Sequence, residues 1–312
     1  MKKGLYQWVF ASLGYLVYTL IVIVFLLWVL FPADSFRLWL QAGLNSLYPA
    51  LKWEIEDVQT ALPIGLQISG INIRDDDVQD PAMRISNLKL TPPLVDLFRL
   101  NSQVPVMFQA KTFDGVMQGK VSFDRKNGSL SLSGSMEDIE LGELKGVWKQ
   151  LNRPVSGKLS GYVHYMGIFS NALQGNLQAD LTIGDGNIGL MQPVLGLENL
   201  EFTQAKSKIS MNNAVIQVEQ GEVESRLFAG SYSGTITLAD SLSTSEVDIQ
   251  GFFEPRSELL GNMQDETTVA LIRTQLQDGK LSYTVNGTLI EPGILFEGMS
   301  GIIDGIIEGG LR

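Results

Sequence analysis

The strongest constraint on this chain is a strict alternation of residue types between Val155 and Ile183. Apolar or glycine residues fill the odd-numbered positions there, and only Asn171 interrupts them: Val155, Gly157, Leu159, Gly161, Val163, Tyr165, Gly167, Phe169, Leu173, Gly175, Leu177, Ala179, Leu181 and Ile183. Most even-numbered positions are polar, among them Ser156, Lys158, His164, Gln178 and Asp180. A period of two predicts strands with one face shielded from solvent and one face exposed to it. The 3.6-residue period of a helix would place apolar and polar residues on the same side. We therefore predict two long strands joined by a turn near Ser170–Asn171.

The same alternation recurs along most of the chain. It is found from Trp53 onward, with a phase change at Gly70 that suggests a bulge. Further alternating segments are 66–73, 83–90, 104–110, 117–123, 130–132, 209–211, 216–218, 230–238, 247–253 and 281–289. Spacings of three and four predict two helices, over 141–151 and 257–276. The Gly184–Asn187 segment, Gly-Asp-Gly-Asn, is interpreted as a hairpin turn.

These patterns predict a mainly β fold of ten to twelve antiparallel strands with a few short helices. A sheet with one apolar face must curl, pack on a second sheet or bind something apolar. Glycines in the apolar rows permit bending, so we expect a strongly curved sheet, with either a groove or an interior filled by side chains. The residues expected to line such a groove are Val155, Leu159, Val163, Tyr165, Leu173, Leu177, Leu181, Ile183, Tyr232, Ile236, Leu281, Tyr283 and Val285.

The N-terminal region predicts a membrane anchor. Residues Gly4 to Ala33 include no charged side chain, and Leu5–Phe31 exceeds the roughly 20 apolar residues that cross a bilayer. No small-residue cleavage site follows, and Lys2 and Lys3 mark the cytoplasmic end. We expect a bacterial inner-membrane protein with a single span and the bulk of the chain in the periplasm.

The domain boundaries follow from these segments. We expect a stub and anchor over 1–33, an amphipathic helix within 34–52, a β domain over 53–292 and a glycine-rich amphipathic tail over 293–312. Asp34–Ser35 offers an N-cap to the helix, whose apolar stripe either rests on the membrane or, as we prefer, plugs one end of the sheet.

Composition excludes several classes of function. The formal net charge of −11 disfavours nucleic acid as a partner. The chain has no cysteine and one histidine, His164, so neither a thiolate metal site nor a catalytic triad is expected. The acidic run Asp75–Asp77 lacks the glycine and distal glutamate of a calcium loop. We expect no catalytic residues, no cofactor and no metal.

Two sets of residues resemble known families. The apolar run ending in Phe31–Pro32, the helix after it and Leu62–Ile73 (LPIGLQISGINI) resemble type II secretion system protein N, the GspN family. The Gly157–Gly161 motif (GKLSG) and Gly175–Leu177 (GNL) are similar to those of AsmA-like envelope proteins. The first resemblance implies a non-catalytic inner-membrane accessory that contacts other subunits of the type II secretion machinery. The second implies a sheet folded into a half-tube and an alternative function, a protein that binds or transfers lipid through an apolar groove in the periplasm.

Overall fold

The structure is a computed structural model. It describes residues 28–47, 51–61, 65–75, 83–93, 103–124, 126–168, 171–239, 241–263 and 266–298, together with short helical pieces at 14–15, 18–19, 22–23 and 25–26.

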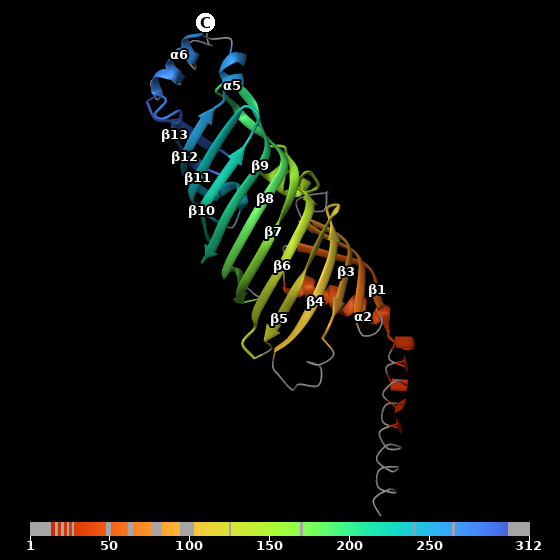
Figure 1. The fold of residues 1–312 in the computed structure, drawn as a ribbon. Helices are drawn as coiled ribbons and strands as arrows, with labels where there is room; N and C mark the ends of the chain where they lie inside the picture. Colours follow the sequence, from red (N-terminus) through yellow and green to blue (C-terminus); the bar gives the residue numbers. More distant parts are fainter. Residues whose placement is uncertain are drawn as a thin grey trace, which may run out of the picture.

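The described residues form one open antiparallel sheet of 14 strands in which each strand pairs with the next one along the chain (Figure 1). The strands are β1 (Leu51–Thr60), β2 (Leu66–Asp75), β3 (Met83–Thr91), β4 (Gln103–Thr112), β5 (Gly115–Asp124), β6 (Ser129–Glu140), β7 (Val155–Ile168), β8 (Asn171–Val194), β9 (Leu197–Asn212), β10 (Val215–Glu224), β11 (Phe228–Thr237), β12 (Glu246–Pro255), β13 (Leu281–Thr288) and β14 (Pro292–Phe296). The mainly β fold with few helices is confirmed, with more strands than the ten to twelve predicted.

The strand register gathers the predicted apolar positions on one face of this sheet. Partners that lie directly opposite each other share a face, and one such row crosses β4 to β14: Val106, Val121, Leu132, Tyr165, Leu177, Met211, Ile216, Ile236, Val247, Gly287 and Pro292. The adjacent row lies on the other face and is mostly polar: Met107, Lys120, Ser133, His164, Gln178, Ser210, Gln217, Thr235, Asp248, Asn286 and Gly293. The sheet therefore has an apolar face and a polar face along its length.

Short helices cover the two ends of the apolar face. At the N-terminal end, α2 (Ala33–Leu47) places Phe36, Leu40 and Leu44 against a buried cluster of β1 and β2 that includes Ile55 and Val58. At the other end, α5 (Ser257–Asn262) and α6 (Glu266–Gln275) contribute Leu259 and Ile272 to a second cluster. That second cluster also contains Phe228, Phe253, Leu281 and Phe296. The expectation that the first helix plugs one end of the sheet is confirmed.

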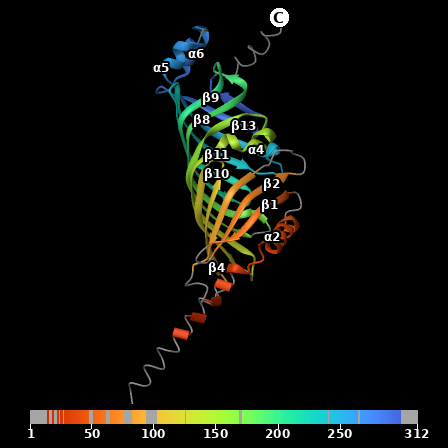
Figure 2. The ribbon, with the colours of Figure 1, turned by 90° about the vertical axis from the view of Figure 1, so that its right-hand side faces the viewer.

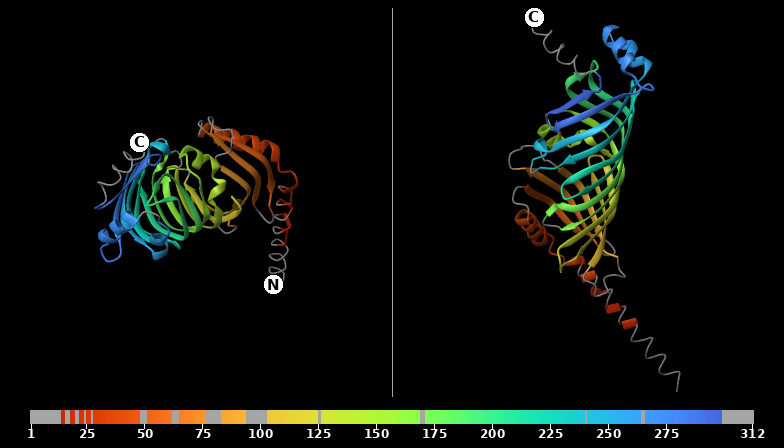
Figure 3. Two further views of the ribbon diagram at one scale, coloured as in Figure 1. Left: turned by 90° about the horizontal axis from the view of Figure 1, so that it is seen from above. Right: turned by 90° about the vertical axis from the view of Figure 1, so that its left-hand side faces the viewer.

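The sheet twists and curves strongly (Figures 1 and 3). Between β6 and β7 the chain forms the 3-10 turn η1 (Leu141–Glu143) and the helix α4 (Lys145–Gln150), which lies near β13 in Figure 2. After α4, Arg153 donates a hydrogen bond of 3.1 Å from Nη2 to the carbonyl of Ile290, in the turn between β13 and β14. Six strand spacings separate β7 from β13, about 29 Å along a flat sheet. The curvature of the sheet, together with the α4 connection that carries Arg153, brings these two segments together.

Several local predictions are corrected. The Gly184–Asn187 segment lies inside β8, where Asp185 adopts a φ of 49° and the register with β7 shifts, so it is a bulge instead of a turn. Around Gly70, whose φ is 65°, the register of β1 with β2 is unshifted. In both strands the side chains that face the core switch between odd-numbered and even-numbered positions at this point. Ile55 and Val58 therefore lie on the same face without a bulge.

The element boundaries also differ from the prediction in two places. The expected helix over 257–276 consists of two helices, α5 and α6. Residues 293–296, assigned above to the glycine-rich amphipathic tail, belong to β14 because Ile294 and Phe296 continue the apolar row of β13. The rest of that tail, 299–312, lies outside the described residues, as do Asp76–Asp77 and much of Leu5–Phe31. Within the described part of the chain, no helix has the length and hydropathy required to span a membrane.

Candidate apolar binding face

The middle of the apolar face is uncovered. We call this region, formed by β4 to β9, the open middle. Most of its large apolar side chains are only partly buried and belong to neither end cluster: Val106, Phe108, Met117, Val121, Leu130, Leu132, Met136, Leu159, Val163, Tyr165, Leu177, Leu181, Ile183 and Ile209. Ile139, Phe202 and Met211 are buried. At its margin, Phe123 is 42% and Leu173 is 41% exposed. No charged side chain occurs in this set, and its one polar group is the Tyr165 hydroxyl. Ser207, opposite Leu181, adds a second hydroxyl to this face.

Glycines let several aromatic rings on this face lie flat against the sheet. A Cβ added to Gly221 would come within 2.1 Å of the Tyr232 ring, and one added to Gly186 within 2.1 Å of the Phe202 ring. In the open middle, Tyr165 lies in the same way over Gly167 and Gly175. A ring that lies flat covers the backbone without standing up from the sheet. The apolar face therefore stays shallow and is not filled by its own aromatic residues.

Most of the predicted groove residues share the apolar face. Leu159 pairs with Ile183, Tyr165 pairs with Leu177, and Leu181 follows on the same face of β8. Leu173 lies in an irregular stretch of β8 between Asn171 and Asn176, where the register with β7 shifts. Val155, Val163, Ile236 and Val285 are also half-buried on this face. Leu281 is an exception, because it is only 1% exposed within the C-terminal cluster. It is a core residue and cannot line an open surface.

Two of the predicted residues, Tyr232 and Tyr283, are held by hydrogen bonds beside the C-terminal cluster. The Tyr232 hydroxyl lies 2.7 Å from Ser207 Oγ, and the Tyr283 hydroxyl donates to the Ser231 carbonyl at 3.3 Å. Burial raises the pKa of Tyr283 to about 12, and Tyr232 adds to this rise. Burial also raises the pKa of Tyr232, an effect that the hydrogen bond with Ser207 opposes. Both phenols remain neutral over the physiological range.

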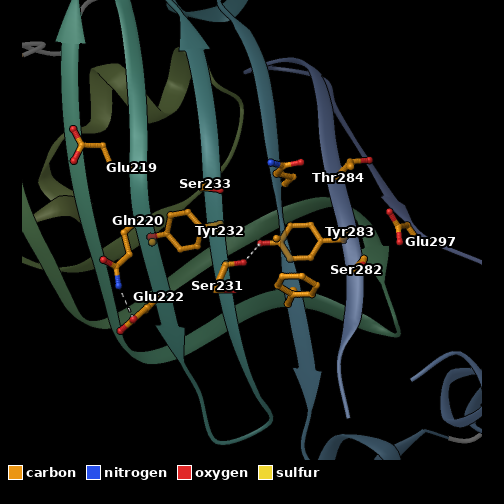
Figure 4. A pocket seen from close by; sticks show the side chains of 14 residues that line it. Glu219, Gln220, Glu222, Ser231, Tyr232, Ser233, Ser282, Tyr283, Thr284 and Glu297 are labelled. Atoms are coloured by element: carbon orange, nitrogen blue, oxygen red, sulfur yellow. Dashed lines mark hydrogen bonds between the residues drawn. The ribbon is translucent and has the colours of Figure 1, made fainter. Parts of the chain in front are cut away.

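The side chains of β10 to β14 also form a hollow of about 440 Å³ (Figure 4). By register, most of its lining side chains belong to the polar face: Gln220, Glu222, Ser231, Ser233, Gln250, Phe252, Ser282 and Thr284. The hollow includes three carboxylates, of Glu219, Glu222 and Glu297, and no lysine or arginine. It is separate from the open middle and differs from it in chemistry.

The two edges of the sheet are protected by different means. Along β1, the side chains of Asn45 and Gln41 accept hydrogen bonds from the backbone amides of Trp53, at 2.8 Å, and Ile55, at 3.5 Å. The Arg37 side chain donates to the backbone carbonyl of Ile55 at 3.3 Å. The α2 helix thus occupies backbone groups that would otherwise invite strand addition. At the other edge, β14 has only five residues and begins at Pro292, which has no N–H to offer.

Sequence reasoning missed the polar stripe of α2 and the position of Arg153. The spacing of Arg37, Gln41 and Asn45, four residues apart, is a detectable signal for one helical face, but it does not reveal that a strand edge lies opposite. Arg153 gave no signal, since the curvature of the sheet, together with the α4 connection, brings it to Ile290.

The described residues contain no group of three or more histidine, cysteine or acidic side chains placed to hold a metal. His164 lies on the polar face, where Nδ1 is 2.9 Å from Ser133 Oγ. Comparison with family models, curated proteins and solved structures gives no match for this chain.

Proposed function

We propose that this protein binds the acyl chain of a lipid on its open middle while anchored to the bacterial inner membrane. The observation that supports this proposal is the difference between the ends and the middle of one continuous apolar face. Helices bury the face at both ends, whereas most of the large apolar side chains on this face of β4 to β9 are only partly buried. Contiguous apolar surface that is left partly exposed is typical of binding sites. A curved sheet with such a face agrees with the AsmA-like half-tube implied by the glycine motifs.

The anchor is part of this proposal. Leu5–Phe31 would hold the sheet beside the bilayer from which lipid is drawn. Two described residues of this run support this placement, because Tyr15 within it is 75% exposed and Leu30 at its C-terminal end is 69% exposed. Large apolar side chains so far from any protein core are suited to a lipid environment. A reporter fused to the C-terminus should be active in the periplasm, and a cytoplasmic reporter would contradict the topology.

Lipid capture by the purified protein tests the binding function. We expect delipidated full-length protein to recover phospholipid from vesicles and to retain it in native mass spectrometry. The variant Leu177→Gln, on the open middle, should reduce recovery several-fold because a buried amide without a partner is costly. Met107→Gln is the matched control, since Met107 is 55% exposed on the polar face. Equal recovery by both variants, or none by the wild type, would contradict the proposal.

A second candidate is a non-catalytic accessory of type II secretion that works through contacts with other subunits. The resemblance of Leu62–Ile73 to the GspN family favours it, and Gly65–Ile73 of that segment lies in and beside β2. Deletion of the gene should then leave exoproteins in the periplasm. Normal secretion by the deletion strain would count against this role without affecting the lipid proposal.

A further inference from the structure

Arg153 is the most unusual cation in the described part of the chain. Its Nη2 donates to the Ile290 carbonyl, but its Nε is buried and has no hydrogen-bond partner. Among the described residues, no carboxylate oxygen lies within ion-pair distance of its guanidinium. Partly buried arginines in proteins are normally paired with an anion. A buried donor with no partner is rare and calls for an explanation, of which a missing ion is one.

The surroundings of Arg153 belong to the apolar side of the sheet. Leu151, two residues before it, is buried, and Val155, two residues after it, lies on the apolar face in a pair with Ile188. The guanidinium reaches from the α4 connection to the turn between β13 and β14, where the curved sheet approaches itself. Burial lowers the pKa of Arg153, as expected for a charge that loses water without gaining a counter-ion. The group nonetheless stays protonated at any physiological pH.

We propose that Arg153 binds the anionic headgroup of the lipid whose acyl chain occupies the open middle. This inference rests on the proposed function and adds to it the class of ligand, an amphiphile with a phosphate. A guanidinium has five N–H donors in a planar fork that matches two phosphate oxygens. The contact to Ile290 uses one of these donors and Nε is buried, so the remaining N–H groups of the two Nη atoms are left for the ligand. The apolar face then holds the chain, and Arg153 fixes which end of the lipid is placed at α4.

A matched pair of probes isolates the contribution of the charge. Full-length protein in nanodiscs of a neutral lipid is titrated with decyl phosphate and with decanol in a calorimeter, and empty nanodiscs give the background from partitioning. We expect the wild type to bind decyl phosphate about tenfold more tightly than decanol, the usual scale of one charge-assisted hydrogen-bonded pair. Added salt should reduce this preference, because exposed parts of the ion pair are screened.

Variants of Arg153 test whether this residue causes the preference for decyl phosphate over decanol. Arg153→Met keeps an unbranched side chain and removes the charge, so it should bind both probes with the weaker, decanol-like affinity. Arg153→Lys keeps the charge without the fork and should bind decyl phosphate with intermediate affinity. Arg226→Met is a control, because Arg226 is exposed on the surface and forms an ion pair with Glu258. It should leave the preference unchanged.

The outcomes separate this inference from the proposed function. If the wild type binds both probes equally, the headgroup inference is overturned and acyl binding stands. If Arg153→Met weakens both probes by the same factor, Arg153 only maintains the structure and the inference is again overturned. If neither probe binds the wild type above the empty nanodiscs, both proposals fail. The comparison between the two probes in the wild type requires no variant, so misfolding of Arg153→Met cannot hide the result.

Discussion

Single glycines determine how closely aromatic rings approach this sheet. Gly221 has no Cβ, and the Tyr232 ring occupies the space that a Cβ would take. The backbone φ of Gly221 is not in the left-handed region, so the constraint at this position is space and not conformation. The ring then reaches across to Ser207 and stays flat. The glycines beneath the aromatic rings therefore determine how far these rings stand above the backbone on the apolar face.

We predict that Gly221→Ala destabilises the protein by about 1–3 kcal/mol, the usual cost of overpacking. The added methyl group must push the Tyr232 ring off the sheet and break its hydrogen bond. In the Tyr232→Ala background the same change should cost much less, and urea unfolding of the four proteins of this double-mutant cycle measures the difference. Gly184→Ala is the control, since no atom lies within 4 Å of its added Cβ. Equal costs in both backgrounds would show that the ring is not the obstacle.

Tyr283 makes folding sensitive to alkaline pH. Its pKa in the folded protein is about 12, above the value of about 10 for a free tyrosine. The unfolded chain therefore loses this proton first, and the stability that Tyr283 provides is complete below pH 10 and is lost as the pH rises toward 12. We predict that Tyr283→Phe flattens the alkaline fall in the free energy of unfolding. The absorbance of tyrosinate, compared between the two proteins, should show the missing step near pH 12. A missing step near pH 10 would contradict the burial of this phenol.

Single elements of this fold were predictable where their residue pattern is local. The alternation at 155–183 correctly located β7 and β8, because a period of two depends on the strand itself. The Gly184–Asn187 segment was misassigned because glycine and aspartate favour both turns and bulges. Only the neighbouring strands, which continue to pair on both sides of Asp185, decide between them. The end of the sheet was misplaced for the same reason, since β14 is recognisable mainly by its pairing with β13.

The α2 helix has two functions in the fold, and sequence revealed one of them. Phe36, Leu40 and Leu44 form the apolar stripe that was predicted to pack. The polar residues that follow each of them, Arg37, Gln41 and Asn45, bond to the open edge of β1. An amphipathic pattern shows which side of a helix is buried. It does not show which strand edge the adjoining polar side chains meet.

Removal of this polar stripe should expose the β1 edge. In the triple variant Arg37→Ala, Gln41→Ala, Asn45→Ala the helix should persist because alanine favours helices. We predict a loss of about 1–3 kcal/mol in the free energy of unfolding from unsatisfied backbone groups. We also predict self-association that increases with concentration and is measured by light scattering. Ser46→Ala, at an exposed position of α2, should change neither property. A monomeric triple variant of unchanged stability would mean that α2 does not protect the edge.

At the scale of the whole molecule, the order of the strands makes the fold nearly one-dimensional. Every strand pairs only with its neighbours in sequence, and the two buried clusters at the ends share no residue. Stability in such an arrangement is close to a sum of local terms, as in repeat proteins. The open middle lies between the two clusters. Unfolding of one end therefore breaks few buried contacts that the other end depends on. A sheet built in this way can keep an uncovered apolar surface at its centre because each end is stabilised independently.

Hydrogen exchange in two core variants tests this independence. Ile272→Ala removes a side chain with 0% exposure from the C-terminal cluster, and Val58→Ala removes one with 1% exposure from the N-terminal cluster. We predict costs of about 2–5 kcal/mol for the first and somewhat less for the second, because valine is smaller. Ile272→Ala should accelerate exchange in β11 to β14 and leave β1 to β3 unchanged, whereas Val58→Ala should do the reverse. Each variant is the control for the other. If both accelerate exchange in all strands, the sheet unfolds as one unit, and the exposed middle must then be stabilised by contacts that span its whole length.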